Sequence, residues 1–307
     1  MANGSLWSGF RMIEFHYGAW KHDGIRCAWE GQTTTLADTW YHRSNEEEVT
    51  MNRHSVPNAV NAYLATPKDG GSNPRFYDFD DGTIRLVKWH PSSHGHKACY
   101  NELVASRLAQ LIDAPMLRGG VVFVPDDIIP DDHRAFASEG FHFGVTKMRG
   151  ENFVPTQHYD NILNATELPF ALVFLHWLRI GDQDNHNQFL ERVVSEDEWN
   201  LKEIGQRFRI VDAGFMYGTP KWNGPDLPAT PPAFHGPKHL IDHVADEDIQ
   251  TALGILGKVS DEAIRACFDV VPDDWAISTE ERNIAAEHAI LSKNRLAAMK
   301  AAELRSA

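Results

Sequence analysis

Two stretches of the sequence carry side chains that suit magnesium binding and phosphoryl transfer. Asp182, Asp184 and Asn187 follow an apolar helical run and share one short polar loop. Further along, the strand-like residues 208–215 place Asp212 two positions before a glycine. Carboxylate and amide oxygens are the ligands that a hard ion such as Mg²⁺ prefers. In phosphoryl transfer, a loop Asp can face the acceptor hydroxyl while a loop Asn and a later Asp hold magnesium. The alternative is a polar turn after a buried helix, with Asp212 as an ordinary turn residue.

A lysine upstream, positioned by a glutamate, could hold the phosphates of a nucleotide. Residues 83–89 alternate as a strand, joined to the strand before it by an Asp-Gly turn, and Lys88 lies among apolar neighbours on it. Glu102 falls in the expected first turn of an amphipathic helix over 99–112. If that helix packs on the strand, Glu102 can pair with Lys88 and position it. The alternatives are a surface lysine on an edge strand and a carboxylate favoured by the helix dipole.

A glycine-rich stretch before this strand suits phosphate binding. Its residues are Gly70, Gly71, Ser72 and Asn73. Backbone N–H groups in such a loop can approach phosphate oxygens, and the hydroxyl of Ser72 adds a further donor. The stretch alone is a weak signal, and its value comes from its position before Lys88.

Histidines and cysteines form no recognisable metal or disulfide framework. His94, His96 and Cys99 lie close together, but no second ligand pair at zinc spacing follows, so we interpret this segment as a polar loop. The other cysteines, Cys27 and Cys267, are far from Cys99 in the sequence. An odd number of widely spaced cysteines is typical of a reducing compartment.

Composition narrows the class of protein. The chain has 307 residues, 42% hydrophobic and 23% charged, which is ordinary for a globular protein with one large domain or two lobes. The net charge of −14 disfavours a broad basic surface for nucleic acid, so no nucleic-acid partner is expected. The longest apolar run, 168–178, is too short to span a bilayer, and the first residues do not form a secretory signal. These features predict a cytoplasmic protein without a membrane partner.

The remaining pattern predicts a sheet followed by helices. Strands are expected at 121–124 and 141–148, and a strand pair at 190–194 and 208–211. Helices are expected at 168–179, where Gly181 would end the helix, and at 249–256, 261–268 and within 279–305. The predicted catalytic loop therefore starts from a buried helix, which gives it a rigid base.

These pieces resemble the HipA-like kinase domain, a distant relation of protein kinases and phosphoinositide kinases. The resemblance runs from about residue 56 to the C-terminus, and the motifs follow the order of the family. They are 70–74, Val87-Lys88, 101–109 with Ala114-Pro115, 181–187, 211–214, and 271–275 with Asn294-Arg295. The resemblance implies an α+β, bilobal protein-kinase-like fold, with a β-rich N-lobe over 51–148 and a mainly helical C-lobe over 149–307. Residues 1–50 lie outside it and are predicted to be a β-rich extension packed on the N-lobe.

The resemblance also implies an activity. It is that of an ATP- and Mg²⁺-dependent phosphotransferase acting on a hydroxyl of a protein, peptide or small-molecule acceptor. Lys88, positioned by Glu102, would contact the nucleotide phosphates together with the glycine-rich stretch. The adenine would lie between the lobes, near the backbone of Lys147 and Met148.

The resemblance leaves the catalytic aspartate open. Asn187 and Asp212 would bind magnesium. Aligning His186 with the histidine of the family loop makes Asp184 catalytic. Asn187 then lies earlier in the loop than the metal-binding asparagine of the family. Aligning Asn187 with the metal ligand of protein kinases makes Asp182 catalytic.

Two other functions remain possible for the same site. The unusual Asp182-Gln183-Asp184 sequence is compatible with nucleotidyl transfer, which would leave AMP on the acceptor. A non-catalytic nucleotide-binding scaffold, with the aromatic N-terminal segment as its partner surface, is the third hypothesis. The full set of metal ligands argues against a scaffold, which would not need them.

Overall fold

The computed structural model describes residues 51, 53–62, 73–148, 150–152, 162–180, 188–197, 200–218, 221–222, 227, 238–269 and 271–306. All of them belong to one structural unit, Glu48–Ala307. Outside the described residues lie the predicted extension 1–50 and several predicted site residues: Gly70, Gly71, Ser72, Asp182, Asp184 and Asn187. None of the described helices is long and apolar enough to cross a membrane.

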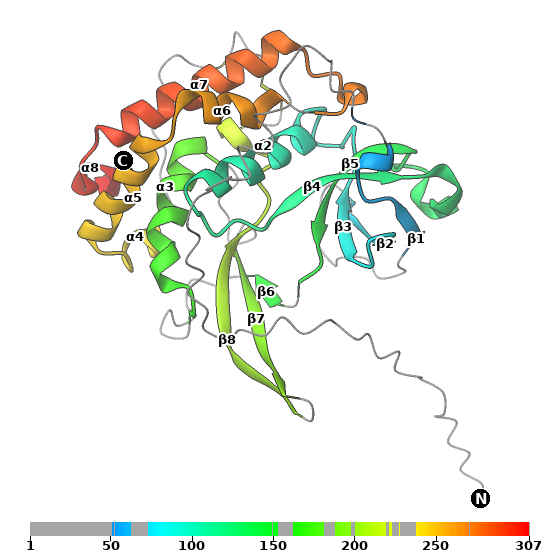
Figure 1. Ribbon diagram of the computed structural model, residues 1–307, viewed down its shortest axis with the longest axis horizontal. Helices are drawn as coiled ribbons and strands as arrows, with labels where there is room; N and C mark the ends of the chain where they lie inside the picture. Colours follow the sequence, from blue (N-terminus) through cyan, green and yellow to red (C-terminus); the bar gives the residue numbers. More distant parts are fainter. Residues whose placement is uncertain are drawn as a thin grey trace, which may run out of the picture. The chain divides into compact units, whose positions relative to one another are not determined.

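A five-stranded antiparallel sheet in the order β1-β2-β3-β5-β4 forms the N-terminal part of this unit (Figure 1). Its strands are β1 (Ala59–Ala62), β2 (Arg75–Phe79), β3 (Ile84–Lys88), β4 (Gly119–Val124) and β5 (Gly140–Thr146). The predicted hairpin is confirmed, and its turn includes Gly82 in the left-handed region at φ +77°. The strands predicted at 121–124 and 141–148 are also confirmed. Because β3 lies between β2 and β5, Lys88 is on an interior strand, so the edge-strand alternative is wrong.

Helix α2 (Ala98–Leu111) follows β3 and packs against β4 and β5. It matches the helix predicted over 99–112, and nearly all of its apolar side chains are buried. The hydroxyl of Ser106 donates to the carbonyl of Gly119 at 3.2 Å and accepts from the N–H of Gly119 at 3.0 Å. This pair of bonds fastens the second half of the helix to the first residue of β4.

The C-terminal part is mainly helical (Figure 1). Its helices are α3 (Leu168–Leu178), α4 (Lys238–Ile241), α5 (Asp246–Lys258), α6 (Asp261–Asp269), α7 (Thr279–Ala297) and α8 (Ala301–Ser306). Helices α3, α5 and α7 pack against one another, and α6 packs against both α7 and α2. The predicted helices at 249–256 and 261–268 are confirmed, and the region 279–305 divides into α7 and α8. At the start of α7, Ser278 and Glu281 form a capping box, which satisfies two otherwise unpaired N–H groups.

Helix α3 ends at a different kind of residue than predicted. The prediction placed the helix over 168–179 with Gly181 ending it, but the last helical residue is Leu178. Arg179 follows in the left-handed conformation, with φ 47° and ψ 51°, and its N–H donates to the carbonyl of Leu175. This conformation costs a non-glycine residue about 1–2 kcal/mol, so the packing around Arg179 must compensate for it. Arginine therefore takes the capping role that glycine usually has, and pattern analysis cannot anticipate that.

A second antiparallel sheet contains the strand that leads to Asp212. Its strands, in order, are β6 (Gly150–Asn152), β7 (Gln188–Asp197) and β8 (Asn200–Ile210). The predicted strand pair is confirmed and extends further, as a long hairpin (Figure 1). The connection between α2 and β4 pairs with the end of β8: the N–H of Leu117 donates to the carbonyl of Ile210 at 2.9 Å. The connection after α2 therefore fixes the end of β8, and with it the direction in which the chain continues to Asp212.

Candidate active site

Lys88 is the charged centre of the candidate site. Its side chain is 17% exposed. The ammonium donates to Oε1 of Glu102 and lies 3.1 Å from Oδ1 of Asp212. The structure thus brings together three of the residues singled out in the sequence, one from β3, one from α2 and one from the segment after β8.

Glu102 connects the strand lysine to the backbone of the Asp212 segment. It is 2% exposed, and both carboxylate oxygens have partners. Oε1 accepts from Lys88, and Oε2 accepts from the N–H of Ala213 at 3.0 Å. Because α2 begins at Ala98, Glu102 lies beyond the first turn, contrary to the prediction. The helix-dipole alternative therefore fails, since that effect is confined to the first turn.

Asp212 presents a carboxylate to the cleft. Its side chain is 50% exposed, and its backbone adopts the left-handed region at φ +59°. The N–H of Gly214 points to Oδ1 at 3.4 Å. Aspartate is one of the few residues other than glycine that tolerate this conformation. Non-glycine residues held there cluster at functional sites, where the surrounding structure keeps them in place.

The three charges set one another's protonation. Burial alone would lower the pKa of Lys88, but attraction to Asp212 and Glu102 outweighs burial and raises it above its usual value. Burial would raise the pKa of Asp212, yet the ammonium of Lys88 lowers it to about 2. Burial, assisted by the nearby Asp212 charge and opposed by Lys88, raises the pKa of Glu102 to about 7. A lysine held charged between carboxylates whose pKa values diverge is a feature of functional sites.

The cleft around this cluster holds about 20 Å³ and is lined by Lys88, Ser92, His94, Ala98, Cys99, Glu102, Asp212 and Gly214. The sequence prediction did not assign Ser92 or His94 to the site. Ser92 and His94 belong to a tight turn in which the Ser92 hydroxyl accepts from the N–H of His94 and donates to the carbonyl of Gly95. The histidines drew attention to this segment in the sequence, but the absence of a second zinc-ligand pair led to its interpretation as a polar loop and not as part of the site. The thiol of Cys99 donates to the carbonyls of Lys88 and Trp89.

The predicted adenine contacts lie at the far end of β3 from the charged cluster. Lys147 directly follows β5, and its N–H donates to the carbonyl of Ile84, the first residue of β3. Its side chain is exposed, with the ammonium 5.2 Å from the ring centroid of Phe76, and Met148 is half-buried. The structure therefore does not bring these two residues to Lys88. The length of β3 separates them from it.

The other predicted residues lie at the borders of the described structure. Asn73 adopts φ 52°, and its carbonyl accepts from the indole N–H of Trp89 at 3.0 Å. Gln188, the first described residue after the predicted catalytic loop, lies opposite Ile210 in the β7–β8 ladder. The chain therefore leaves that loop two residues from Asp212 in the sheet register.

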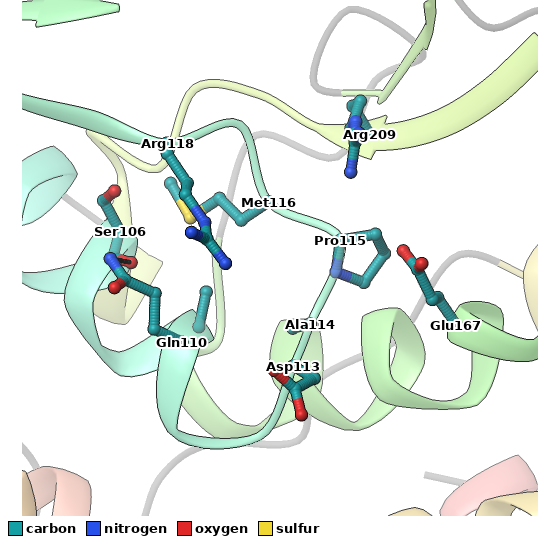
Figure 2. A pocket seen from close by; sticks show the side chains of 10 residues that line it. Ser106, Gln110, Asp113, Ala114, Pro115, Met116, Arg118, Glu167 and Arg209 are labelled. Atoms are coloured by element: carbon teal, nitrogen blue, oxygen red, sulfur yellow. Dashed lines mark hydrogen bonds between the residues drawn. The ribbon is translucent and has the colours of Figure 1, made fainter. Parts of the chain in front are cut away.

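A larger cavity of about 280 Å³ lies beside the second half of α2. Arg118 and Arg209 face Asp113 and Glu167 across it (Figure 2). Its full lining is Ser106, Ala109, Gln110, Asp113, Ala114, Pro115, Met116, Arg118, Glu167 and Arg209, none of which is a predicted site residue. Among the described residues, no group of three or more His, Cys, Asp or Glu side chains is arranged to hold a metal ion.

Comparisons with known proteins support the fold. No protein-family model and no curated protein matches the sequence. Among solved structures, the Helicobacter pylori proinflammatory kinase CtkA matches with a TM-score of 0.54 and 14% identity, over 81% of this chain and 98% of that one. The Golgi casein kinase with Mn/ADP bound matches with a TM-score of 0.39 and 11% identity, over 82% and 71%, too weakly to support an inference. The chain thus has the predicted protein-kinase-like fold, and HipA-like membership stays a prediction.

Proposed function

We propose that the protein is an ATP- and Mg²⁺-dependent phosphotransferase of the HipA-like kind. Its acceptor would be a hydroxyl of a protein, peptide or small molecule. The observation that carries the proposal is the cluster of Lys88, Glu102 and Asp212 on a protein-kinase-like fold. A strand lysine held by a helix glutamate, beside an aspartate that can bind metal, is how kinases position nucleotide phosphates.

Asp212 has the properties of a magnesium ligand. Its side chain is half exposed at the cleft. The ammonium of Lys88 outweighs the effect of burial and lowers the pKa of Asp212 to about 2, so the carboxylate is ionised at neutral pH. Asn187 is the proposed second ligand. When bound, Mg²⁺ would neutralise charge on the phosphates during transfer.

Lys88 would change partners when the nucleotide enters. The ammonium of Lys88 is already paired with Glu102 and lies 3.1 Å from Oδ1 of Asp212, so a phosphate oxygen would take the place of Asp212 beside it. Lys88 would then pair with phosphate oxygens while Glu102 keeps it in position. Asp212 would exchange the ammonium for the metal ion.

In the transfer step, Asp182 or Asp184 would orient the acceptor hydroxyl and take its proton. The acceptor oxygen forms a bond to the γ-phosphorus while the bond from that phosphorus to the bridging oxygen breaks. The bonding electrons leave with ADP. The protein contributes positioning and charge neutralisation, with no covalent intermediate on its own side chains.

The proposal is tested by thermal unfolding with Mg·ATP on wild type and on Asp212→Ala. A ligand that binds only the folded state adds about 2.7 kcal/mol of stability at 100 times its Kd. We expect a rise in Tm for wild type that needs magnesium and is lost in Asp212→Ala. Asp242→Ala, which removes an exposed carboxylate next to α4, serves as the matched control and should behave as wild type.

Three outcomes would count against this function. No stabilisation of wild type by any nucleotide would contradict the nucleotide site. Product mass separates the remaining alternatives: an acceptor carrying AMP would indicate nucleotidyl transfer, and binding without any consumption of ATP would indicate a scaffold.

A further inference from the structure

Asn101, the residue before Glu102, ties helix α2 to two separate points of the chain after Asp212. It is fully buried. Its side-chain amide donates to the carbonyl of Gly214 at 2.8 Å, and its Oδ1 accepts from the indole N–H of Trp222 at 3.1 Å. The site needs a donor and an acceptor on one short side chain, which asparagine provides.

Trp222 is held from three sides. Besides the bond to Asn101, its carbonyl accepts from the ammonium of Lys97 at 2.6 Å, and the same ammonium lies 4.2 Å from the centroid of its ring. The edge of the ring also meets Tyr217 at a centroid distance of 6.1 Å. Trp222 is 3% exposed, so these polar contacts are shielded from water, where they are stronger than at a surface.

The same lysine reaches the C-terminal helices. Lys97 forms an ion pair of 2.6 Å with Oε1 of Glu281, whose other oxygen completes the capping box of α7. Lys97 and Asn101 are one helical turn apart, and the N–H of Asn101 donates to the carbonyl of Lys97. The start of α2 is therefore fastened both to the segment after Asp212 and to α7.

Adjacent residues of α2 grip adjacent residues beyond Asp212. Glu102 binds the N–H of Ala213, and Asn101 binds the carbonyl of Gly214. If Trp222 moves away, Oδ1 of Asn101 is left buried without its donor, which is an unfavourable state. The position of Trp222 is therefore linked to the alignment of Glu102 with Ala213, and through Glu102 to Lys88.

We propose that Asn101 and Trp222 are positioning residues that hold α2 in register with the Asp212 segment, so that Lys88, Glu102 and Asp212 stay assembled for Mg·ATP. This inference rests on the proposed function and deepens it. Neither residue touches the nucleotide in the proposal; both act through Glu102.

Trp222→Phe tests the role because it keeps an aromatic ring for Lys97 and Tyr217 and removes the N–H that Asn101 needs, together with the ring volume that any Trp→Phe change removes. Mg·ATP affinity is measured by calorimetry and stability by urea unfolding. We expect the affinity to fall about tenfold, the value of one buried hydrogen bond. Trp275→Phe is the matched control, because Trp275 is equally buried and donates its indole N–H to the carbonyl of Phe141 at 2.8 Å. It should lose stability while its affinity stays that of wild type.

Amide hydrogen exchange provides a second measurement that needs no nucleotide. The N–H of Ala213 should exchange faster in Trp222→Phe than in wild type or Trp275→Phe. If Trp222→Phe does not fold, Lys97→Met, which removes the other anchor of Trp222, is expected to give the same two changes.

The two proposals fail in different ways. Wild type that binds Mg·ATP, with Trp222→Phe binding equally well, would overturn the positioning role alone. Unchanged exchange at Ala213 would also overturn it. Wild type that does not bind Mg·ATP would overturn the nucleotide function, and the positioning role with it.

Discussion

The two cavities along helix α2 differ in how their charges are held. The cleft at its first half has only about 20 Å³, but Lys88 is fixed there between Glu102 and Asp212. The cavity at its second half has about 280 Å³, and the charged side chains that line it include Arg118, which is exposed (Figure 2). Volume alone would select the second. The desolvated charges with divergent pKa values indicate that the first is the functional site. Burying charges costs free energy that the rest of the structure must offset, and such groups cluster at functional sites.

Lys88→Met should have the largest effect. It removes the only cation of the cluster among the described residues and leaves two carboxylates facing each other. We expect ATP consumption, measured as ADP formed, to fall about 10²–10³-fold, the usual loss when one stabilising donor is removed. Turnover equal to wild type would break the distinction between the two cavities.

Glu102→Gln sharpens the comparison by keeping the shape and removing the charge. Glutamine can still accept from the N–H of Ala213 but cannot form the ion pair with Lys88. We expect a tenfold to hundredfold loss of ATP turnover, on the order of 1.4–2.7 kcal/mol. If Asp212→Ala lost ATP turnover while Glu102→Gln kept it, Lys88 would be positioned by groups other than Glu102.

Burial and the nearby Asp212 charge raise the pKa of Glu102 to about 7, against the effect of Lys88. Because of this raised pKa, ATP turnover and the free energy of unfolding should change in opposite directions with pH. A raised folded-state pKa contributes stability that is complete below about 4.3, the usual value for glutamate, and is lost as pH rises through 7. ATP turnover should rise over the same range, because the ionised carboxylate holds Lys88. Glu102→Gln should therefore gain stability relative to wild type, by up to about 1.4 kcal/mol per pH unit.

Urea unfolding of both proteins from pH 5 to pH 8 checks this. The comparison cancels buried groups that titrate in the same window, such as His142, whose pKa burial lowers to about 4. A constant difference between wild type and Glu102→Gln would show that Glu102 titrates as an exposed carboxylate does.

Arg118→Ala should have the smallest effect. Arg118 lines the larger cavity and is exposed. Substitutions at such surface positions usually change the free energy of unfolding by less than about 0.5 kcal/mol. We expect ATP turnover and Mg·ATP affinity to equal those of wild type. A loss comparable to that in Glu102→Gln would place the larger cavity in the function and end the contrast.

The sequence alone was sufficient for the main elements. Alternation with an Asp-Gly turn predicted β2 and β3, and helical periodicity predicted α2, α5 and α6. These signals are local, because the burial of one face of a strand or helix is written into a window of about ten to eighteen residues. The ends of elements were less predictable: Arg179 ends α3 where glycine was expected, and Glu102 lies beyond the first turn of α2.

Residue types and their order also indicated Lys88, Glu102 and Asp212 as one chemical set. Their assembly, however, was decided by tertiary structure. Lys88 and Glu102 are 14 positions apart, and Glu102 and Ala213 are 111 apart, so only the packing of α2 between the sheet and the end of β8 brings them together. The sequence pattern indicated a polar loop at His94 and did not assign it to the site, and the anchor at Trp222 had no local signal, because its contacts join segments distant in the chain. Long-range contacts form only when several elements bury their faces together, and no single stretch of sequence records that outcome.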